Sequence, residues 1–490
     1  MRDEFVLLGI ILLLLVAEIM LIGKNRKIVA GIATGMFMVH TVIGFFPLPE
    51  GVLFGGSYRT THLLHNMKNI MNVGVVILLL QTWTWAREEW SGRGRMSEFY
   101  LLIFSTLLGM YYMVSSGDFL MFFLGLELAS LPIGGLAAYD LSKMRSAEAG
   151  AKFILMAGLA SAISLFGISM IYGITGSLYF SEVAQNFHLS GLGTIGLLFF
   201  ISGLAFKISL VPFHFWTPDV YEGAPVPVTS YLSVISKAAA IFALAIVLFL
   251  IGREFVSIWK PAIYWMAVLT MTVGNLFALR QKNMKRFLAF SSVAQAGFIL
   301  LGILSFDQMG MAAVVYFAAI YIFSNLATFG VVQVISLKTG KENMDDYNGL
   351  YRTNPKLSLV MLLGLFSLAG IPPVAGFFGK FFLFMSAAAH GYYWLVIIAV
   401  INVTISLYYY LLVVRAMFLR KSDTPIEPFQ AEMPVKIGLA LTVVGILTLG
   451  LYSPFYDFIL NLSTNIRLRL FLENTYLGNS IKPMIISSPL

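Results

Sequence analysis

The chain has 490 residues, of which 59% are hydrophobic and only 11% are charged. Soluble domains carry about 25% charged residues, so this composition excludes a separate soluble domain and indicates a polytopic α-helical membrane protein. The net charge of +8 follows from membrane topology and does not indicate nucleic-acid binding. The absence of cysteine excludes iron–sulfur clusters and thiolate chemistry in this chain, and the six histidines lack the spacing of a metal site.

Apolar runs of about 20 residues, the length that crosses a bilayer core, recur along the whole chain. The first run has an acidic leading segment and no small-residue cleavage site, so we interpret it as a transmembrane helix and not as a signal peptide. The pattern predicts fourteen spans, at about 5–22, 27–47, 69–87, 98–116, 118–139, 149–173, 194–216, 226–252, 261–279, 284–304, 311–337, 355–389, 392–418 and 434–453.

The distribution of lysine and arginine predicts the orientation of these spans, because loops on the inner side of a membrane are enriched in both residues. Loops on one side of the predicted spans carry most of the 32 lysines and arginines. This bias places that side inside, and it places both termini outside.

Helix breakers interrupt two of the predicted spans. Span seven carries Pro212, and span twelve carries Pro372 and Pro373 in GIPPVAGFFGKFF. Gly/Pro-interrupted helices at corresponding positions of two halves are typical of inverted-repeat transporters. The predicted fold is therefore all-α, with helices 1–3 (1–97), a first five-helix repeat of helices 4–8 (98–252), an inverted second repeat of helices 9–13 (261–420), and helix 14 with a tail (434–490).

Four ionisable residues lie near the middle of predicted spans, namely Glu127, Lys207, Lys237 and Lys380. Each charge at the bilayer centre costs about 2.5–3.5 kcal/mol on insertion scales. A structural Glu127–Lys207 ion pair with two snorkelling lysines is one reading, but lysines snorkel from helix ends. The alternative reading is a proton path, since a row of lysines that can each be neutral or charged can load and release protons.

The break at Pro212 gives a reason for a lysine and a helix breaker in one segment. Proline interrupts the helical hydrogen bonds, and the freed backbone groups can bind water beside Lys207. His214 then either extends the relay or caps the break. In the loop predicted after this span, Asp219 and Glu222 form either a solvated turn or a proton-collecting mouth.

Further polar residues are candidates for a secondary role in the relay. Lys152, at the inner start of span six, is either a snorkelling anchor or part of an inlet. The SSVAQAG segment supplies Ser291, Ser292 and Gln295 to span ten. Such side chains either line a water path or hydrogen-bond neighbouring helices.

Several segments resemble the antiporter-like subunits of respiratory complex I over about residues 70–420. They include GDFLMFFLGLELASLP, KISLVPFHFWTPDVYEGAPVPVTSYLSVISKAAA, RQKNMKRFLAFSSVAQAGFILLG and GIPPVAGFFGKFFLF. The VYEGAP loop, with a lysine in span eight and another in span twelve, looks specifically like the subunit N group of this family. A sibling group, subunit M, is similar but typically has a glutamate where Lys380 stands.

The resemblance implies a Glu–Lys pair at Glu127 and Lys207, a central lysine at Lys237 and an outlet-side lysine at Lys380. It implies no cofactor or metal in this chain, with NADH, flavin, iron–sulfur clusters and quinone handled by other subunits of the complex. Family members often have histidine where Gln295 stands, so this position is not titratable here, although a glutamine can still bind water.

The resemblance also implies a multi-pass location in the bacterial inner membrane, between subunits of the K and M type, and a function as a proton-translocating subunit of NADH:quinone oxidoreductase. Two alternatives remain at this point. One is a Na⁺/H⁺ antiporter subunit of the multisubunit cation-antiporter type, which uses the same fold, and the other is a non-pumping assembly scaffold.

Overall fold

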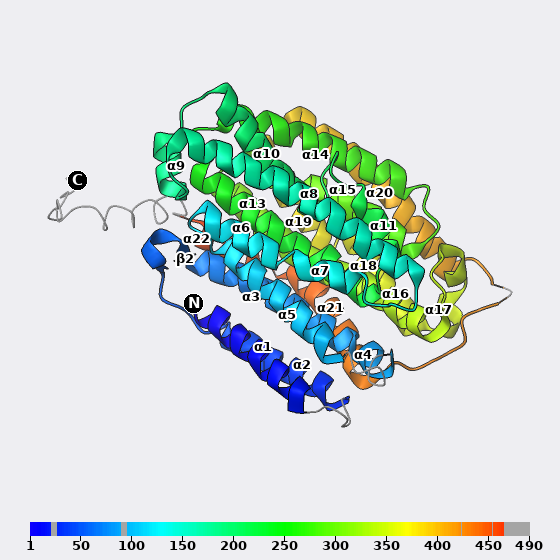
Figure 1. The fold of residues 1–490 in the computed structure, drawn as a ribbon. Helices are drawn as coiled ribbons and strands as arrows, with labels where there is room; N and C mark the ends of the chain where they lie inside the picture. Colours follow the sequence, from blue (N-terminus) through cyan, green and yellow to red (C-terminus); the bar gives the residue numbers. More distant parts are fainter. Residues whose placement is uncertain (21–26, 90–95, 423, 453, 465–490) are drawn as a thin grey trace, which may run out of the picture.

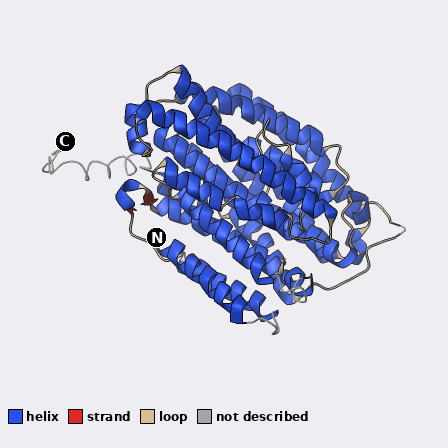
Figure 2. Cartoon of the chain, in the orientation of Figure 1, coloured by secondary structure: helices blue, strands red, loops and turns tan. Residues whose placement is uncertain are grey.

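The computed structural model describes residues 1–490 except 21–26, 90–95, 423, 453 and 465–490. The described chain is a single bundle of helices with roughly parallel axes (Figure 1). Strands β1 (Gly51–Leu53) and β2 (Tyr58–Thr60) pair as a short antiparallel hairpin at one end of the bundle (Figure 2). The predicted tail after residue 464 and the end of the first predicted span, 21–22, lie outside the described residues.

The first half of the described chain forms helices α1 (Arg2–Met20), α2 (Lys27–Ile43), η1 (Phe54–Gly56), α3 (His62–Gln81), α4 (Trp83–Glu89), α5 (Met96–Val114), α6 (Phe119–Leu128), α7 (Leu131–Ala137), α8 (Met144–Thr175), α9 (Phe180–Asn186), α10 (Gly191–Ile208), α11 (Trp216–Gly223), α12 (Val226–Tyr231), η2 (Leu232–Ser236) and α13 (Lys237–Ile251). The second half forms α14 (Val256–Ala278), α15 (Met284–Ser305), α16 (Gln308–Thr339), η3 (Met344–Tyr347), α17 (Leu350–Thr353), α18 (Pro355–Ala369), α19 (Ala375–Ala389), α20 (Tyr393–Phe418), α21 (Met433–Leu451) and α22 (Pro454–Ser463).

Within the described residues, 11 helical segments are long and apolar enough to cross a membrane, and shorter apolar helices lie at Ile28–Ile43, Pro355–Ala369 and Ala375–Ala389. The prediction of an all-α multi-pass membrane protein is therefore confirmed. The total of fourteen spans and their division into two inverted repeats stay predictions. Side-chain caps fix several helix starts. Asp118, Ser190, Asn283 and Asp307 each accept hydrogen bonds from free amides in the first turn of the following helix.

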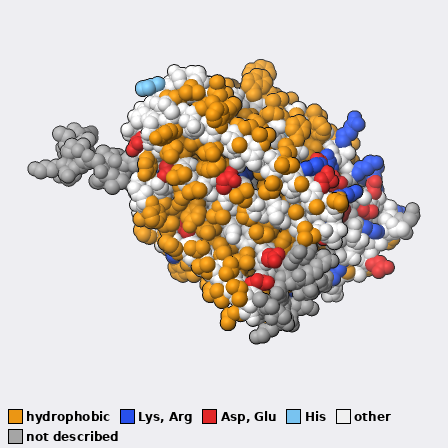
Figure 3. Space-filling model, viewed as in Figure 1, with side chains coloured by type: hydrophobic (Ala, Val, Ile, Leu, Met, Phe, Trp, Pro, Cys, Tyr) orange, Lys and Arg blue, Asp and Glu red, His pale blue; other side chains and the backbone are white. Residues whose placement is uncertain are grey.

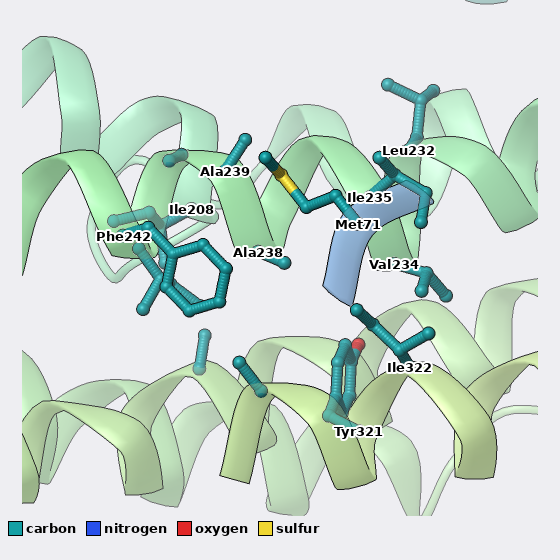
Figure 4. Packing of buried hydrophobic residues seen from close by; sticks show 14 of the residues in the cluster. Met71, Ile208, Leu232, Val234, Ile235, Ala238, Ala239, Phe242, Tyr321 and Ile322 are labelled. Atoms are coloured by element: carbon teal, nitrogen blue, oxygen red, sulfur yellow. The ribbon is translucent and has the colours of Figure 1, made fainter. Parts of the chain in front are cut away.

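The segment from α12 through η2 to α13 forms the centre of the bundle, because every residue from 226 to 251 is buried. Figure 4 shows Met71 of α3 and Tyr321 and Ile322 of α16 packed around Leu232 to Phe242 of this segment. At the two flanks, α1 with α2 and α14 with α20 expose large apolar side chains such as Phe5, Trp265 and Trp394. These flanks present surfaces suited to lipid or to neighbouring subunits.

The two ends of the bundle differ in charge. Lysine and arginine side chains gather at the end that carries α17 (Figure 3), which we call the basic face. The N-terminus, the hairpin, α9 and α22 lie at the opposite end, which we call the N-terminal face (Figure 1). The predicted orientation places the basic face inside the cell.

Three sequence-based predictions need correction. Lys207 does not lie at mid-helix, because α10 ends one residue later at Ile208. Asp219 and Glu222 belong to the short helix α11 and not to a loop. Lys68, predicted to lie in an outer loop before span three, is 2% exposed inside α3. In each case the prediction relied on hydrophobic runs, which do not reveal where polar side chains find partners inside the bundle.

Candidate functional site

Lys237 occupies an unusual place on the central segment. It is the first residue of α13, directly after the π-helical turn η2, and its side chain is 1% exposed. The Lys237 Nζ donates to Ser292 Oγ at 2.8 Å and to Ser292 O at 3.1 Å. Single π-helical turns are rare and frequently occur at functional sites. Here the turn sets Lys237 against α15, the helix that carries Ser292.

One helical turn of α15 connects this lysine with a second buried lysine. Gln295 lies three residues after Ser292 and therefore on the same side of the helix. The Gln295 Nε2 donates to Leu368 O at 2.8 Å, and the same carbonyl accepts from Lys380 Nζ at 2.8 Å. Ser292 and Gln295, together with the Leu368 carbonyl, thus form a polar connection between Lys237 and Lys380.

Lys380 lies against the break in predicted span twelve. The first segment, α18, ends at Ala369, and α19 begins at Ala375, so Pro372 and Pro373 lie in the break as predicted. The last carbonyls of a helix have no intrahelical partner and carry partial negative charge. Lys380 Nζ uses two of them, donating to Leu368 O and to Ala369 O at 3.1 Å, and it also lies 4.8 Å from the centre of the Phe298 ring.

Glycine is required where the two halves of this broken helix meet. A Cβ atom at Gly376 would collide with the carbonyl oxygen of Ser367. The close approach is held by Ser367 Oγ, which accepts from Gly376 N at 3.1 Å. The first turn of α19 is thereby held beside the last turn of α18, and this arrangement keeps Lys380 next to the free carbonyls.

Lys207 lies against a helix break that the sequence analysis missed. Predicted span five is divided into α6 and α7 at Ala129 and Ser130. Lys207 Nζ donates to Ser130 Oγ at 2.6 Å and to Ala129 O at 3.1 Å. Pro132, at the start of α7, is the sequence signal that could have revealed this break.

Glu127, at the end of α6, does not form the predicted direct ion pair with Lys207. No ion pair within 4.0 Å joins the two side chains in the described part of the chain. The Glu127 carboxylate is still near enough to act electrostatically on Lys207. Glu127 is half-buried, and its Oε1 is buried without a hydrogen-bond partner among the described residues.

The break after Lys207 is less open than predicted. Trp216 Nε1 donates to Phe206 O at 2.9 Å, and Val211 N donates to Thr270 Oγ1 of α14 at 2.9 Å. Side chains therefore satisfy several backbone groups that the break at Pro212 releases. His214 lies within the break, 4% exposed, with its Nδ1 buried and without a protein partner in the described residues.

The remaining predicted residues of span ten also enter the network. The Ser291 hydroxyl lies 2.6 Å from the Tyr410 hydroxyl of α20, and Gln295 Nε2 donates to the same Tyr410 oxygen at 3.2 Å. Tyr410 was not identified from the sequence, because a tyrosine on an apolar helix gives no distinguishing signal. Hydrogen bonds thus join Ser291, Tyr410 and Gln295 to the Leu368 carbonyl that Lys380 contacts, while Lys237 contacts Ser292, the residue next to Ser291.

Lys152 lies apart from this network, at the basic face. Its Nζ donates to Asp219 Oδ2 at 2.9 Å and pairs with Glu148 at 2.8 Å. Arg286 reaches Asp219 at 2.7 Å and Glu222 at 3.0 Å. Burial raises the pKa of Asp219, but the hydrogen bonds from Lys152 and Arg286 outweigh this effect and hold the pKa below its ordinary value.

Two cavities open at this face. One of about 220 Å³ is lined by Lys152, Asp219, Glu222 and Arg286, among others. The other, of about 310 Å³, is lined by Glu222, Lys285, Glu342 and neighbouring residues. Both volumes exceed the space that one water molecule requires. Among the described residues, no group of three or more His, Cys, Asp or Glu is placed to hold a metal ion.

Comparison with known proteins shows the family to which this chain belongs. A sequence profile described as NADH:quinone oxidoreductase/Mrp antiporter, TM, matches residues 116–406, which include all four predicted mid-membrane charges. The chain therefore belongs to this family of antiporter-like membrane subunits. Among its relatives, NADH-quinone oxidoreductase subunit N of Phocaeicola vulgatus is 48% identical, with 93% of this chain and 97% of the relative aligned. Subunit N of Azobacteroides pseudotrichonymphae is 43% identical, with 94% and 97% aligned.

Solved structures agree with this assignment. A chain of respiratory complex I from Thermus thermophilus is 28% identical and has a TM-score of 0.74, covering 96% of this chain and 98% of its own length. A chain of the Mrp complex from Dietzia sp. is 20% identical with a TM-score of 0.85, covering 98% and 100%, and this likeness concerns the fold alone. The resemblance to antiporter-like subunits is confirmed, and subunits of membrane complexes are the partners of such chains.

Proposed function

We propose that this chain translocates protons across the bacterial inner membrane as a subunit of an NADH:quinone oxidoreductase. The observation that carries the proposal is the polar connection between two buried lysines. Lys237 and Lys380 are 1% and 4% exposed. Lys237 donates to Ser292 of α15, and Lys380 donates to Leu368 O, which also accepts from Gln295 one turn further along α15. Buried cations without a carboxylate partner are costly in a membrane and mark ion pathways.

Protons enter, in this proposal, at the basic face, through the two cavities beside Asp219 and Lys285. They are exchanged at Lys207, pass to Lys237, and continue by Ser292 and Gln295 to Lys380. Among the described residues, none of the three relay lysines has a carboxylate within the 4.0 Å of a salt bridge. Their acceptors are hydroxyls and carbonyls, so the loss of a proton leaves a neutral amine with usable neighbours and no orphaned negative charge.

The energy comes from outside this chain in our proposal. Redox chemistry in other subunits, which hold the flavin, iron–sulfur clusters and quinone, shifts a charge next to Glu127. Because Glu127 is half-buried at the end of α6 and acts on Lys207 without touching it, a new neighbouring charge can change how strongly Lys207 holds its proton. Moving one charge against 100 mV requires about 2.3 kcal/mol, which this coupling must supply.

The same proposal includes several finer points from the sequence. The neighbours are expected to be subunits of the K and M type, with lipid on the remaining flanks. The basic face lies inside and both termini outside. Helices α5 to α13 and α14 to α20 correspond to the two inverted repeats, each with its broken helix.

The experiment uses the assembled complex in proteoliposomes and measures protons moved per electron alongside NADH:quinone turnover. Lys207→Ala and Lys237→Met should lower the proton-to-electron ratio of correctly assembled complex. Lys356→Met is the matched control, because Lys356 is exposed in the first turn of α18. An unchanged ratio in either relay variant would contradict the proposal.

The alternatives predict different results. A scaffold subunit keeps full pumping in Lys380→Met as long as the complex assembles. A Na⁺/H⁺ antiporter subunit retains a Na⁺-dependent proton flux in vesicles without NADH or quinone, and it copurifies with no flavin or iron–sulfur subunits.

A further inference from the structure

A second cluster of buried titratable side chains lies at the N-terminal face, outside the relay described above. We call it the N-terminal cluster, and its members are Asp3, Glu4, His40, His65, Lys68 and Tyr111. Asp3 and Glu4 begin α1 and are 3% and 1% exposed. They face two bases on consecutive turns of α3, because His65 Nδ1 lies 2.8 Å from Asp3 Oδ2 and Lys68 forms an ion pair with Glu4.

The cluster continues from these ion pairs to α5 and α2. Lys68 Nζ also donates to the Tyr58 hydroxyl of β2 at 3.1 Å and lies 5.6 Å from the centre of the Tyr111 ring. Tyr111 donates its hydroxyl hydrogen to Asn72 Oδ1, and its oxygen lies 3.1 Å from His40 Nε2. Each of the elements that meet here, α1, α2, β2, α3 and α5, contributes at least one of these groups.

Polar atoms without partners gather in the same place. His40 Nδ1, His65 Nε2 and Asn72 Nδ2 are buried and have no hydrogen-bond partner among the described residues. The three side chains are 1%, 7% and 0% exposed. Buried polar atoms of this kind are normally satisfied by ordered water. The cluster therefore holds three buried polar atoms that ordered water can satisfy.

Packing of α1 against α5 and α2 does not require this arrangement. In a membrane, helices associate through close packing of small and apolar side chains. Burying charges costs several kcal/mol per ion, and even a well-formed buried pair is often no more stabilising than apolar residues of similar size. A histidine ring can bind a proton at either of its two nitrogens. The composition of the cluster suits proton exchange better than it suits anchoring.

The cluster lies between the partly exposed N-terminal face and side chains that pack against the central segment. On the outer side, Arg2 is partly exposed and contacts Asp3 at 3.3 Å. On the inner side, Tyr111 follows Met110, whose sulfur lies 3.9 Å from the Tyr231 hydroxyl. Tyr231 immediately precedes the π-helical turn η2, which ends directly before Lys237.

We infer that the N-terminal cluster is a hydrated proton-exchange site, through which protons that have passed the relay leave at the N-terminal face of the membrane. The inference rests on the proposed function, because it assigns a route by which the translocated proton leaves. The site holds protons and water and needs no other ligand.

The step at this site conserves charge and atoms. Neutral His65 binds a proton at Nε2, and the resulting imidazolium is held by the Asp3 carboxylate through its Nδ1–H. Release of one proton to water near Arg2 returns His65 to its neutral form. The other charges that face His65 are those of Glu4 and Lys68, which are already paired, while His40, Tyr58 and Tyr111 are the remaining titratable groups around it. When His65 is neutral, the negative charge of the Asp3 carboxylate is therefore still paired with the Arg2 guanidinium.

The test compares three variants in the assembled complex, reconstituted in proteoliposomes. Tyr111→Phe removes the hydroxyl that contacts Asn72 and His40 but leaves both ion pairs of α1 in place, so α1 still docks. His65→Gln removes the exchangeable proton while its amide can still bind Asp3. Both should lower the proton-to-electron ratio by as much as Lys237→Met does, and Asp3→Glu, which keeps the carboxylate, should retain the ratio.

Tyr316→Phe is the matched control, because it removes a hydroxyl that lies outside the cluster and donates to Leu449 O at 2.6 Å between α16 and α21. Full pumping by Tyr111→Phe and His65→Gln, with pumping lost in Lys237→Met, overturns the exchange site alone. Full pumping by Lys237→Met overturns the proposed function and this inference with it. Should His65→Gln fail to assemble, Tyr111→Phe decides the question by the same ratio.

Discussion

The turn of α15 that connects the two buried lysines makes Gln295 the most informative residue to change. Replacing it with leucine keeps a similar volume and removes two hydrogen bonds, to Leu368 O and to the Tyr410 hydroxyl. Neither acceptor is left without a partner, because Lys380 still donates to Leu368 O and Ser291 still contacts Tyr410. The structural cost is therefore limited to two net hydrogen bonds at about 1 kcal/mol each.

The effect on proton transfer should be larger than the effect on folding. If the barrier for transfer between Lys237 and Lys380 rises by the same ~2 kcal/mol, the step slows about 30-fold. The complex should then assemble at near-normal levels and show a reduced proton-to-electron ratio in proteoliposomes, normalised to assembled complex. Gln295→His, which keeps a polar group at this position, should retain most of the ratio.

The matched control is Gln81→Leu. Gln81 is another buried glutamine, and its Nε2 donates to Leu326 O of α16 at 3.1 Å, away from the lysines. It removes one side-chain hydrogen bond, so it should cost about half as much stability, without changing the ratio. Wild-type pumping in Gln295→Leu, or equal losses in the two leucine variants, would refute the reasoning that α15 carries the proton.

Two further predictions concern the basic half of the relay. Ser130→Ala removes the 2.6 Å contact of Lys207 but keeps the Ala129 carbonyl, so the ratio should fall less than in Lys207→Ala when both are measured in proteoliposomes. Asp219→Asn should lower the thermal stability of the complex near pH 7, because Lys152 and Arg286 hold the pKa of Asp219 below its ordinary value. That contribution is fully present above about pH 4, the unfolded value, and is lost as the pH falls through the depressed folded pKa. Melting curves of wild type and variant should therefore converge in acid, and a constant difference down to that range would count against the ion network.

Much of the fold and part of the site could be predicted from the sequence because the membrane imposes simple rules. The lengths of the apolar runs predicted most helices, and the pair Pro372 and Pro373 predicted the break beside Lys380. The rule that charges avoid the bilayer centre singled out Lys237, Lys380 and Glu127. These inferences concern single residues or local segments, so no tertiary information was needed.

The contacts of the lysines could not be predicted, because they depend on packing between distant helices. Nothing in the chain order connects Lys237 with Ser292, and Ser291 beside it faces Tyr410 instead. The N-terminal cluster was missed for a related reason. Asp3 precedes the first predicted span and Lys68 the third, and hydropathy cannot reveal that α1 and α3 bring them together.

Two of the relay lysines share one structural solution. Lys207 lies at the α6–α7 break and Lys380 at the end of α18, and each uses carbonyls that the interruption leaves free. Lys237 follows a π-helical turn on its own helix, but its acceptors, Ser292 Oγ and Ser292 O, belong to the continuous helix α15. An uninterrupted helix offers few free backbone acceptors within the bilayer. Interruptions expose carbonyls and place hydroxyls next to them, so a buried ammonium can be held by neutral groups.

Neutral acceptors let a buried lysine release its proton, whereas a carboxylate acceptor does not. A carboxylate partner would fix the proton on the lysine, because losing it would leave a buried negative charge. Carbonyl and hydroxyl partners stabilise the ammonium by a smaller amount, about 1.5–3 kcal/mol per charged hydrogen bond, and remain neutral when the proton leaves. A distant charge acting through Glu127 then needs to supply only a comparable free energy to move the proton on. The helix interruptions are in this sense the feature that lets a mostly apolar bundle hold protons reversibly.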